Sequence, residues 1–134
     1  MSITSHIDPA SGLVTLTVDG PVDGAMIKQA LQIVVEDPLF KRGADVLWDF
    51  ADARGLNPSG EGIQDLVRFV GSIREKRGSG YRVAIVTRGD LEYGFARMYE
   101  AYAENLPFAL RVFRDRDEAM LWLKSQSRTP EPGA

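Results

Sequence analysis

Two aspartates stand at the end of an apolar segment, in the sequence VLWDFAD over residues 46–52. Asp49 and Asp52 would lie at the carboxyl end of a strand, where open α/β sheets commonly place their ligands. Paired carboxylates there could bind magnesium or act as an acid and a base. The structural alternative is that one of them accepts backbone N–H groups and fixes the shape of the loop, as aspartate often does in turns. We favour this structural interpretation.

The segment that follows has a glycine spacing typical of phosphate-binding loops. Gly55 and Gly60 form the pattern Gly-x-x-x-x-Gly between an expected strand and an expected helix. A nucleotide-binding loop then needs a lysine followed by serine or threonine. Glu61 and Gly62 stand there instead, and a carboxylate at that position repels phosphate. We therefore do not expect nucleotide hydrolysis.

The residues for nucleophilic catalysis are scarce. His6 is the only histidine and the chain has no cysteine, so thiolate chemistry is excluded and a catalytic triad would have to recruit His6 from an N-terminal hairpin. The chain contains no Gly-x-Ser-x-Gly nucleophile motif. We expect neither an enzyme, nor a cofactor, nor a metal site.

Aromatic and basic side chains gather over residues 90–104. This segment could line a pocket with Phe95, Arg97, Met98, Tyr99 and Tyr102, in which Arg97 would bind an anion. The ordinary alternative is that the aromatic residues pack a helix and the arginine is solvated.

A basic stretch lies just before this segment. It begins with Arg74, Lys76 and Arg77 and continues with Arg82 and Arg88. Cations are favourable near the carboxyl end of a helix because of the helix dipole. This explains the first three residues without a ligand.

Strands and helices alternate along the chain. Hydrophobic periodicity predicts strands over residues 3–7, 13–18, 45–50, 81–87 and 109–113. It predicts helices from Asp23 to the Asp37–Pro38 pair and over residues 59–76, 90–104 and 115–124. The strict alternation over residues 13–18 is typical of an outer strand, and the apolar runs at 46–48 and 83–86 indicate central strands.

The expected helix over residues 90–104 has an apolar stripe formed by Leu91, Phe95, Met98 and Tyr102. We expect this stripe to face the sheet.

The order β-β-α-β-α-β-α-β-α predicts an α/β fold with a mixed five-stranded sheet, an N-terminal β-hairpin and helices on both faces. The 134 residues suit one domain, over residues 1–124, with a polar and mobile tail over residues 125–134.

Charge and hydropathy exclude several classes of partner. With 16 basic and 19 acidic residues the chain lacks the positive field of a nucleic-acid binder. No basic segment precedes an apolar run at the N-terminus, and no stretch approaches the roughly 18 apolar residues of a membrane span. We expect a cytoplasmic protein.

The pattern resembles the bacterial STAS-like domains of the SpoIIAA-like family, whose founding members are anti-sigma-factor antagonists. The resemblance extends over residues 3–124 and is carried by residues 46–52, the loop 55–62, and the segments 94–99 and 111–115. It implies a non-enzymatic protein-interaction or regulatory domain.

The resemblance also bears on phosphorylation. Classical antagonists carry an Asp-Ser-Ser-Gly-like turn whose first serine is phosphorylated, and the corresponding positions here are Asn57, Pro58, Ser59 and Gly60. The phosphoacceptor position is thus Pro58, which has no hydroxyl, so the resemblance implies a domain without the classical phosphoserine switch. Ser59 could accept phosphate at a helix N-terminus, although its simpler role is to cap the helix.

Three functions follow, in this order of preference. The first is a STAS-like interaction module that contacts an unidentified protein partner through residues 54–62, with Asp49, Asp52, Asn57, Ser59 and Gly60 as the candidate site. The second is a small apolar ligand or lipid carrier, which the resemblance of this family to lipid-binding Sec14-type domains also implies. The third is a metal-dependent enzyme that uses Asp49 and Asp52. A homodimer is the commonest oligomer and is expected only on that ground.

Overall fold

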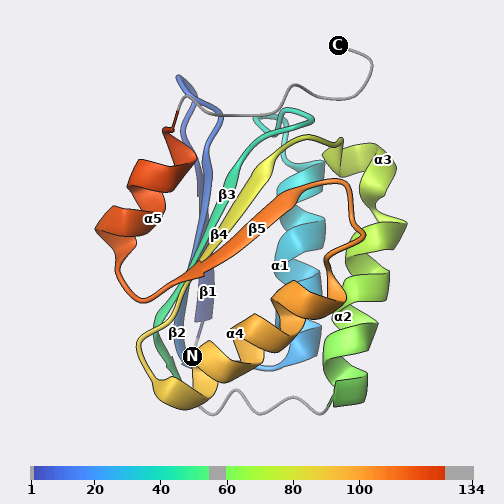
Figure 1. Ribbon diagram of the computed structural model, residues 1–134. Helices are drawn as coiled ribbons and strands as arrows, with labels where there is room; N and C mark the ends of the chain where they lie inside the picture. Colours follow the sequence, from blue (N-terminus) through green and yellow to red (C-terminus); the bar gives the residue numbers. More distant parts are fainter. Residues whose placement is uncertain (1, 55–59, 126–134) are drawn as a thin grey trace.

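A five-stranded mixed sheet forms the centre of the molecule (Figure 1). The computed structural model describes residues 2–54 and 60–125. Neighbouring strands in the sheet are successive strands in the sequence. The first two pair antiparallel as a hairpin and all later pairs are parallel. The strands are β1 (Ser2–Ile7), β2 (Val14–Pro21), β3 (Val46–Arg54), β4 (Arg82–Val86) and β5 (Ala109–Phe113).

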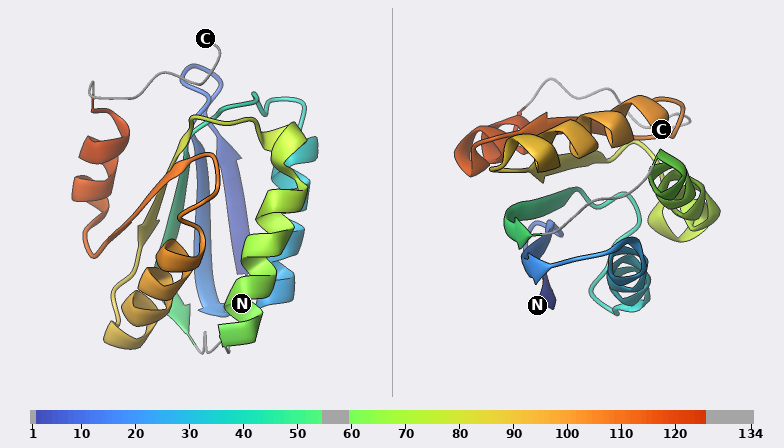
Figure 2. Two further views of the ribbon diagram at one scale, coloured as in Figure 1. Left: turned by 45° about the vertical axis from the view of Figure 1, so that its right-hand side comes forward. Right: turned by 90° about the horizontal axis from the view of Figure 1, so that it is seen from below.

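Within the described residues, five helices cover the sheet unevenly. They are α1 (Gly24–Glu36), α2 (Gly60–Ser72), α3 (Arg74–Arg77), α4 (Asp90–Tyr102) and α5 (Arg116–Leu123). Parallel crossovers are right-handed, so connections that always step to the next strand in one direction place their helices on one face. Figure 2 shows α1 and α2 on one side of the sheet and α5 on the other. The predicted α/β fold, with its hairpin and order of elements, is confirmed.

Two apolar cores result, one on each face of the sheet. The larger core joins α1, α2 and α4 to residues such as Leu16, Trp48 and Ile85. The smaller one joins α5, through Ala119 and Leu123, to buried residues of β3, β4 and β5. Successive residues of a strand point to opposite faces, which explains why the continuous apolar run of β4 is buried throughout.

Local signals in the sequence explain where two helices begin. Asp23 caps α1, as predicted, because its Oδ1 accepts a hydrogen bond of 2.9 Å from the N–H of Met26. Asp115 caps α5 in the same way by accepting from the N–H of Asp117.

Within the described residues, none of the helices combines the length and the apolar character that crossing a membrane requires.

The structure corrects the prediction that residues 13–18 form an outer strand. β2 lies between β1 and β3 and pairs with both. Val14, Leu16 and Val18 are fully buried under the helices, whereas Thr15 and Thr17 on the other face are only partly buried. The alternation of apolar and polar residues in β2 therefore arises because the helices bury one face of the sheet more completely than the other. It does not indicate that β2 lies at the edge of the sheet.

The helix predicted over residues 59–76 is interrupted. α2 ends at Ser72, and Ile73 leaves the helical conformation before α3 begins. The hydroxyl of Ser72 donates a hydrogen bond of 2.6 Å to the carbonyl of Phe69. Such bonds from serine to the preceding turn compete with the helix and bend it.

The expected apolar stripe of α4 is rotated. Leu91, Met98 and Tyr102 are 60%, 39% and 43% exposed, whereas Ala96 is buried. The residues of the expected stripe and the inward-facing residues Glu92, Ala96 and Tyr99 both recur every three or four positions. Periodicity alone therefore does not distinguish the two faces of the helix. α4 thus turns three large apolar side chains toward solvent.

Candidate ligand-binding cavity

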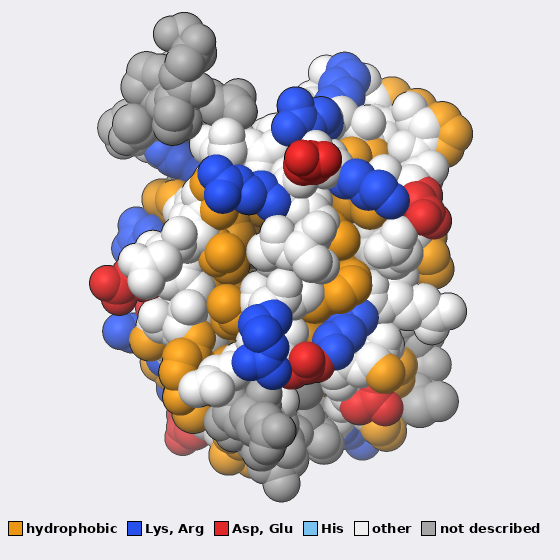
Figure 3. Space-filling model, turned by 90° about the vertical axis from the view of Figure 1, so that its right-hand side faces the viewer, with side chains coloured by type: hydrophobic (Ala, Val, Ile, Leu, Met, Phe, Trp, Pro, Cys, Tyr) orange, Lys and Arg blue, Asp and Glu red, His pale blue; other side chains and the backbone are white. Residues whose placement is uncertain are grey.

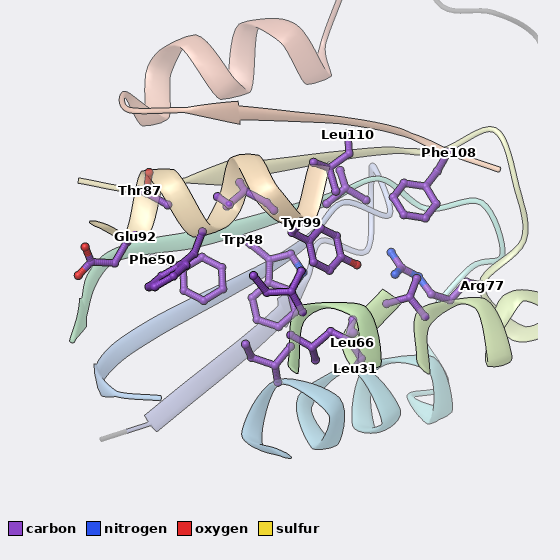
Figure 4. Close-up of a pocket in the computed structure, with 17 residues that line it drawn as sticks. Leu31, Trp48, Phe50, Leu66, Arg77, Thr87, Glu92, Tyr99, Phe108 and Leu110 are labelled. Carbon is purple, nitrogen blue, oxygen red and sulfur yellow. The ribbon is translucent and has the colours of Figure 1, made fainter. Parts of the chain in front are cut away.

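An apolar cavity lies between the sheet and the helices α1, α2 and α4 (Figure 4). Its volume is about 80 Å³. Each contributing element supplies its inward-facing side chains. The lining residues are Ile27, Leu31, Trp48, Phe50, Ile63, Leu66, Val70, Arg77, Val83, Ile85, Thr87, Glu92, Phe95, Ala96, Tyr99, Phe108 and Leu110.

Alternate residues of the central strands point to the same face of the sheet and form the floor of the cavity. Trp48 and Phe50 of β3 point to the same face, and their rings stack at a centroid distance of 5.4 Å. Val83 and Ile85 of β4 extend the floor next to them. The floor is therefore a continuous aromatic and aliphatic surface.

One end of the cavity carries a buried arginine. Arg77 is 4% exposed, and Figure 4 shows its guanidinium extending from α3 into the cavity. The guanidinium lies 4.5 Å from the centroid of the Tyr81 ring and 5.9 Å from that of Phe108. Among the described residues no carboxylate pairs with it, and its Nη2 is buried without a hydrogen-bond acceptor. Burial lowers the pKa of Arg77 because the charged form loses its hydration.

The backbone at Arg77 is fixed by a close approach between Gly78 and Gly43. Gly78 has a φ of 87°, and a Cβ there would lie 2.8 Å from the backbone nitrogen of Gly43. The N–H of Gly43 donates a hydrogen bond of 2.7 Å to the carbonyl of Arg77. Only glycine allows this close approach, which fixes the path of the backbone directly after Arg77.

Tyr99 lies beside the arginine. Figure 4 shows its ring crossing the cavity from α4 with the hydroxyl directed toward Arg77. Burial raises the pKa of Tyr99 because its anion would be poorly solvated, so the neutral hydroxyl is available as a hydrogen-bond donor. Arg77 and Tyr99 together form a donor-rich end of the cavity.

The opposite end of the cavity is acidic. Thr87 and Glu92 lie there, far from Arg77 in Figure 4. The Oγ1 of Thr87 is buried and makes no hydrogen bond in the structure. The cavity thus has a cationic end, an apolar middle and an acidic end.

The predicted pocket residues separate into two groups. Phe95 and Tyr99 line the cavity. Met98 and Tyr102 are exposed on the outer side of α4, and Arg97 lies with them. The Nε of Arg97 forms an ion pair of 2.9 Å with Glu100 on the surface, so the arginine that faces the cavity is Arg77 and not Arg97.

The predicted partner loop is only partly described. Asn57 and Ser59 lie outside the described residues, and Gly60 is the first residue of α2. Asp52 is exposed, with its Oδ1 3.8 Å from Arg88.

Asp49 takes the structural role that we favoured. Its Oδ1 accepts a hydrogen bond of 2.9 Å from the N–H of Ala51, and its Oδ2 pairs with Arg116 at 2.9 Å. Both oxygens are therefore engaged within the protein. In the part of the chain that the structure describes, no group of three or more acidic or histidine side chains is placed to hold a metal ion.

Sequence reasoning assigned Arg77 to the helix dipole and missed its place in the core. A signal was present, since the buried positions Ile63, Leu66, Val70 and Ile73 continue at the same spacing to residue 77. Position 77 lies on the buried stripe, and an arginine there indicates either a buried partner or a ligand.

Comparisons with known proteins give a fold. No protein-family model and no curated protein matches the chain. Among solved structures, the chain is similar to an uncharacterised protein of the DUF3478 family with a SpoIIAA-like fold from Shewanella loihica PV-4. The two share 19% sequence identity with a TM-score of 0.57, and the match covers 91% of this chain and 92% of the other. The five-stranded sheet, its N-terminal hairpin and this match together show that the chain has a SpoIIAA-like fold.

Proposed function

We propose that this protein is a non-enzymatic domain that binds a small apolar molecule in the cavity beneath α4. The observation that carries the proposal is the cavity itself, because three helices and the sheet turn apolar side chains toward it. Pockets for small molecules are concave and mostly apolar, with a few polar groups that fix the orientation of the ligand. Arg77, Tyr99, Thr87 and Glu92 are polar groups of this kind.

The polar groups of the cavity support binding over catalysis. Nucleophilic catalysis needs a hydroxyl or thiol within hydrogen-bond reach of a base. The hydroxyl of Thr87 has no such partner in the structure. The remaining polar groups stand at two separate ends of an apolar space, which suits a ligand with distinct ends.

The proposal is tested by titrating the ¹⁵N-labelled protein with 1-hexanol, a neutral apolar probe, and following backbone amide shifts by NMR. We expect saturable shifts of residues around the cavity. Ala96→Leu should weaken binding of the alcohol by about tenfold or more, because Ala96 lies on the cavity wall and the added atoms occupy the space.

The matched control is Ala101→Leu, the same change at an exposed position of α4, which should leave the affinity unchanged. Overpacking in a core costs roughly 1–3 kcal/mol, so folding of Ala96→Leu is checked by urea denaturation. If that variant does not fold, Leu110→Phe narrows the cavity from β5, where the residue is only partly buried. Shifts that do not saturate, or that both alanine variants retain equally, would contradict the proposal.

The interaction module preferred from the sequence stays a prediction. Its loop, residues 55–59, lies outside the described residues. A bulky residue at Gly60 together with Ser59→Asp should weaken capture of a protein partner while the fold is preserved. Hexanol binding should be unaffected by these two changes, which separates the two functions.

A further inference from the structure

The charge of Arg77 is uncompensated within the described fold. Its side chain is 4% exposed, its Nη2 has no acceptor, and its close neighbours are the rings of Tyr81 and Phe108. Taking a charged group out of water costs several kcal/mol even after relaxation. A cation placed over an aromatic ring recovers about 2 kcal/mol when both groups are removed from water. The fold therefore keeps an unpaired cation that faces an apolar cavity.

We infer that the ligand is a small apolar carboxylate whose head group pairs with Arg77 and whose apolar chain lies along the cavity toward Thr87. This inference rests on the proposed function and adds the chemical class and orientation of the ligand. A carboxylate would accept a hydrogen bond from the buried Nη2 and a second one from the hydroxyl of Tyr99, which points to the same place (Figure 4). Hydrogen bonds between guanidinium and carboxylate are among the strongest in proteins.

The far end of the cavity fixes the direction of binding. Glu92 lies there beside Thr87, and the carboxylate of Glu92 repels an anion. The middle of the cavity, with Trp48, Phe50 and Ile85, offers apolar contact only. An anionic head group is thus favoured at the Arg77 end and disfavoured at the other.

The count of charges favours a carboxylate over a phosphate. Arg77 is the one cationic residue among the cavity-lining residues that the structure describes. A phosphate monoester carries a charge of about −1.5 to −2 at pH 7, so one guanidinium would leave part of that charge buried and unpaired. A carboxylate carries a single negative charge and is matched.

The volume of the cavity sets the length of the chain. About 80 Å³ is several times the roughly 10–15 Å³ that one water requires, but below the ~150 Å³ at which an engineered apolar cavity holds benzene. The cavity therefore admits only a short chain. Hexanoate has eight non-hydrogen atoms against the six of benzene, so its binding requires α4 to move outward.

The outer surface near Arg77 is basic. Arg42, Arg74 and Lys76 are exposed on or beside α3, and Figure 3 shows Lys and Arg side chains gathered on this face with hydrophobic side chains between them. Glu75 is also exposed on α3, and the Nζ of Lys76 lies 4.0 Å from Glu36, so the excess of positive charge is modest. An excess of one charge raises the local concentration of oppositely charged ligands. The surroundings of the cavity thus favour the arrival of an anion.

The inference is tested with hexanoate and 1-hexanol, which share a chain and differ in charge. The affinity of each for the intact protein is measured by NMR titration at pH 7. We expect hexanoate to bind about tenfold or more tightly than hexanol, as a charged hydrogen bond implies. Arg77→Met should remove this preference while hexanol still binds, because methionine keeps the apolar stem and takes away the charge.

Arg74→Met is the matched control, since Arg74 lies on the same short helix but is exposed, and it should keep the preference for hexanoate. Equal affinity for hexanoate and hexanol in the unaltered protein would overturn the inference and leave the proposed function standing. Failure of both probes to bind would overturn the two together. Tighter binding of hexyl phosphate than of hexanoate would replace the carboxylate by a phosphate.

Discussion

Arg77 and Thr87 are the residues of the described chain with a buried side-chain polar atom that makes no hydrogen bond. Both line the same cavity, at opposite ends of it. Unsatisfied buried polar atoms are rare because each forfeits its interaction with water. Two of them in one cavity indicate that its polar groups are arranged for something other than the stability of the fold.

Replacing Thr87 by valine tests whether its unpaired hydroxyl lowers the stability of the fold. Threonine and valine have nearly the same shape, so Thr87→Val removes an unpaired hydroxyl from a residue that is 2% exposed. The desolvation cost of such a group is about 1–3 kcal/mol, and we expect the free energy of unfolding to rise by about 1 kcal/mol. Urea denaturation with an unchanged m-value measures this change.

Thr4→Val is the control for that substitution, because Thr4 is exposed on β1 and surface changes usually stay within about 0.5 kcal/mol. A loss of stability in Thr87→Val of 1 kcal/mol or more would show that the hydroxyl has a partner in solution.

Of the three long helices that cover the cavity, α4 contributes the fewest buried residues, whereas in the described chain α1 and α2 each contribute three. Ala96 is its one buried residue, and Leu91, Met98 and Tyr102 are exposed. The sequence predicted the helix but not its rotation, because polar Glu92 lies on the cavity side and large apolar residues lie on the solvent side. A pattern of hydrophobicity reports the face that prefers burial, whereas the observed rotation depends on the shape of the sheet beneath.

Hydrogen exchange tests the role of α4. Segments with few buried contacts open with small free energies, so the amides of α4 should exchange faster than those of β3 and β4. Saturating hexanoate should slow exchange in α4, since the ligand packs against Phe95, Ala96 and Tyr99. The comparison is made with and without ligand by mass spectrometry.

The helix α5 supplies the internal control because it lies on the other face of the sheet, and its exchange should not change with hexanoate. Equal slowing in α4 and α5 would indicate general stabilisation instead of a ligand beneath α4.

At the scale of the whole molecule, the sheet separates a face that carries the cavity from a face that carries α5. Alternation along β4 sends Val83, Ile85 and Thr87 to the cavity and Arg82 and Ala84 to the other side. The order of elements, and with it this division, followed from the sequence, since successive parallel crossovers of one hand leave little choice. The cavity did not, because its volume depends on how well large side chains from different elements fill the space.

A mutation on the α5 face of the sheet should change stability without changing ligand binding on the other face. Arg82 is buried, its Nη1 donates to the carbonyl of Trp122, and its guanidinium lies 5.1 Å from the centroid of the Trp122 ring. A charged hydrogen bond contributes about 1.5–3 kcal/mol, so Arg82→Ala should lower the free energy of unfolding by about 2 kcal/mol or more. Hexanoate affinity, measured where the variant is folded, should be unchanged.

Arg111→Ala provides the comparison, since Arg111 is exposed and its guanidinium lies 5.7 Å from the centroid of the same ring. This change should cost less than about 1 kcal/mol, as exposed cation–π contacts do. A loss of hexanoate binding in folded Arg82→Ala would mean that the faces are coupled through the sheet.

The sequential strand order also determines when the cavity closes during synthesis. Chains are made from the N-terminus, and domains begin to fold as they emerge. Each strand of this sheet pairs with one made just before it, so β1 to β4 can assemble while Phe108 and Leu110 are still in the ribosome. Until these two residues arrive, one wall of the cavity is missing and water still reaches Arg77. Arg77 is thus removed from water only when this last wall forms. A ligand present at that stage can bind before the cavity closes and does not have to enter the folded domain.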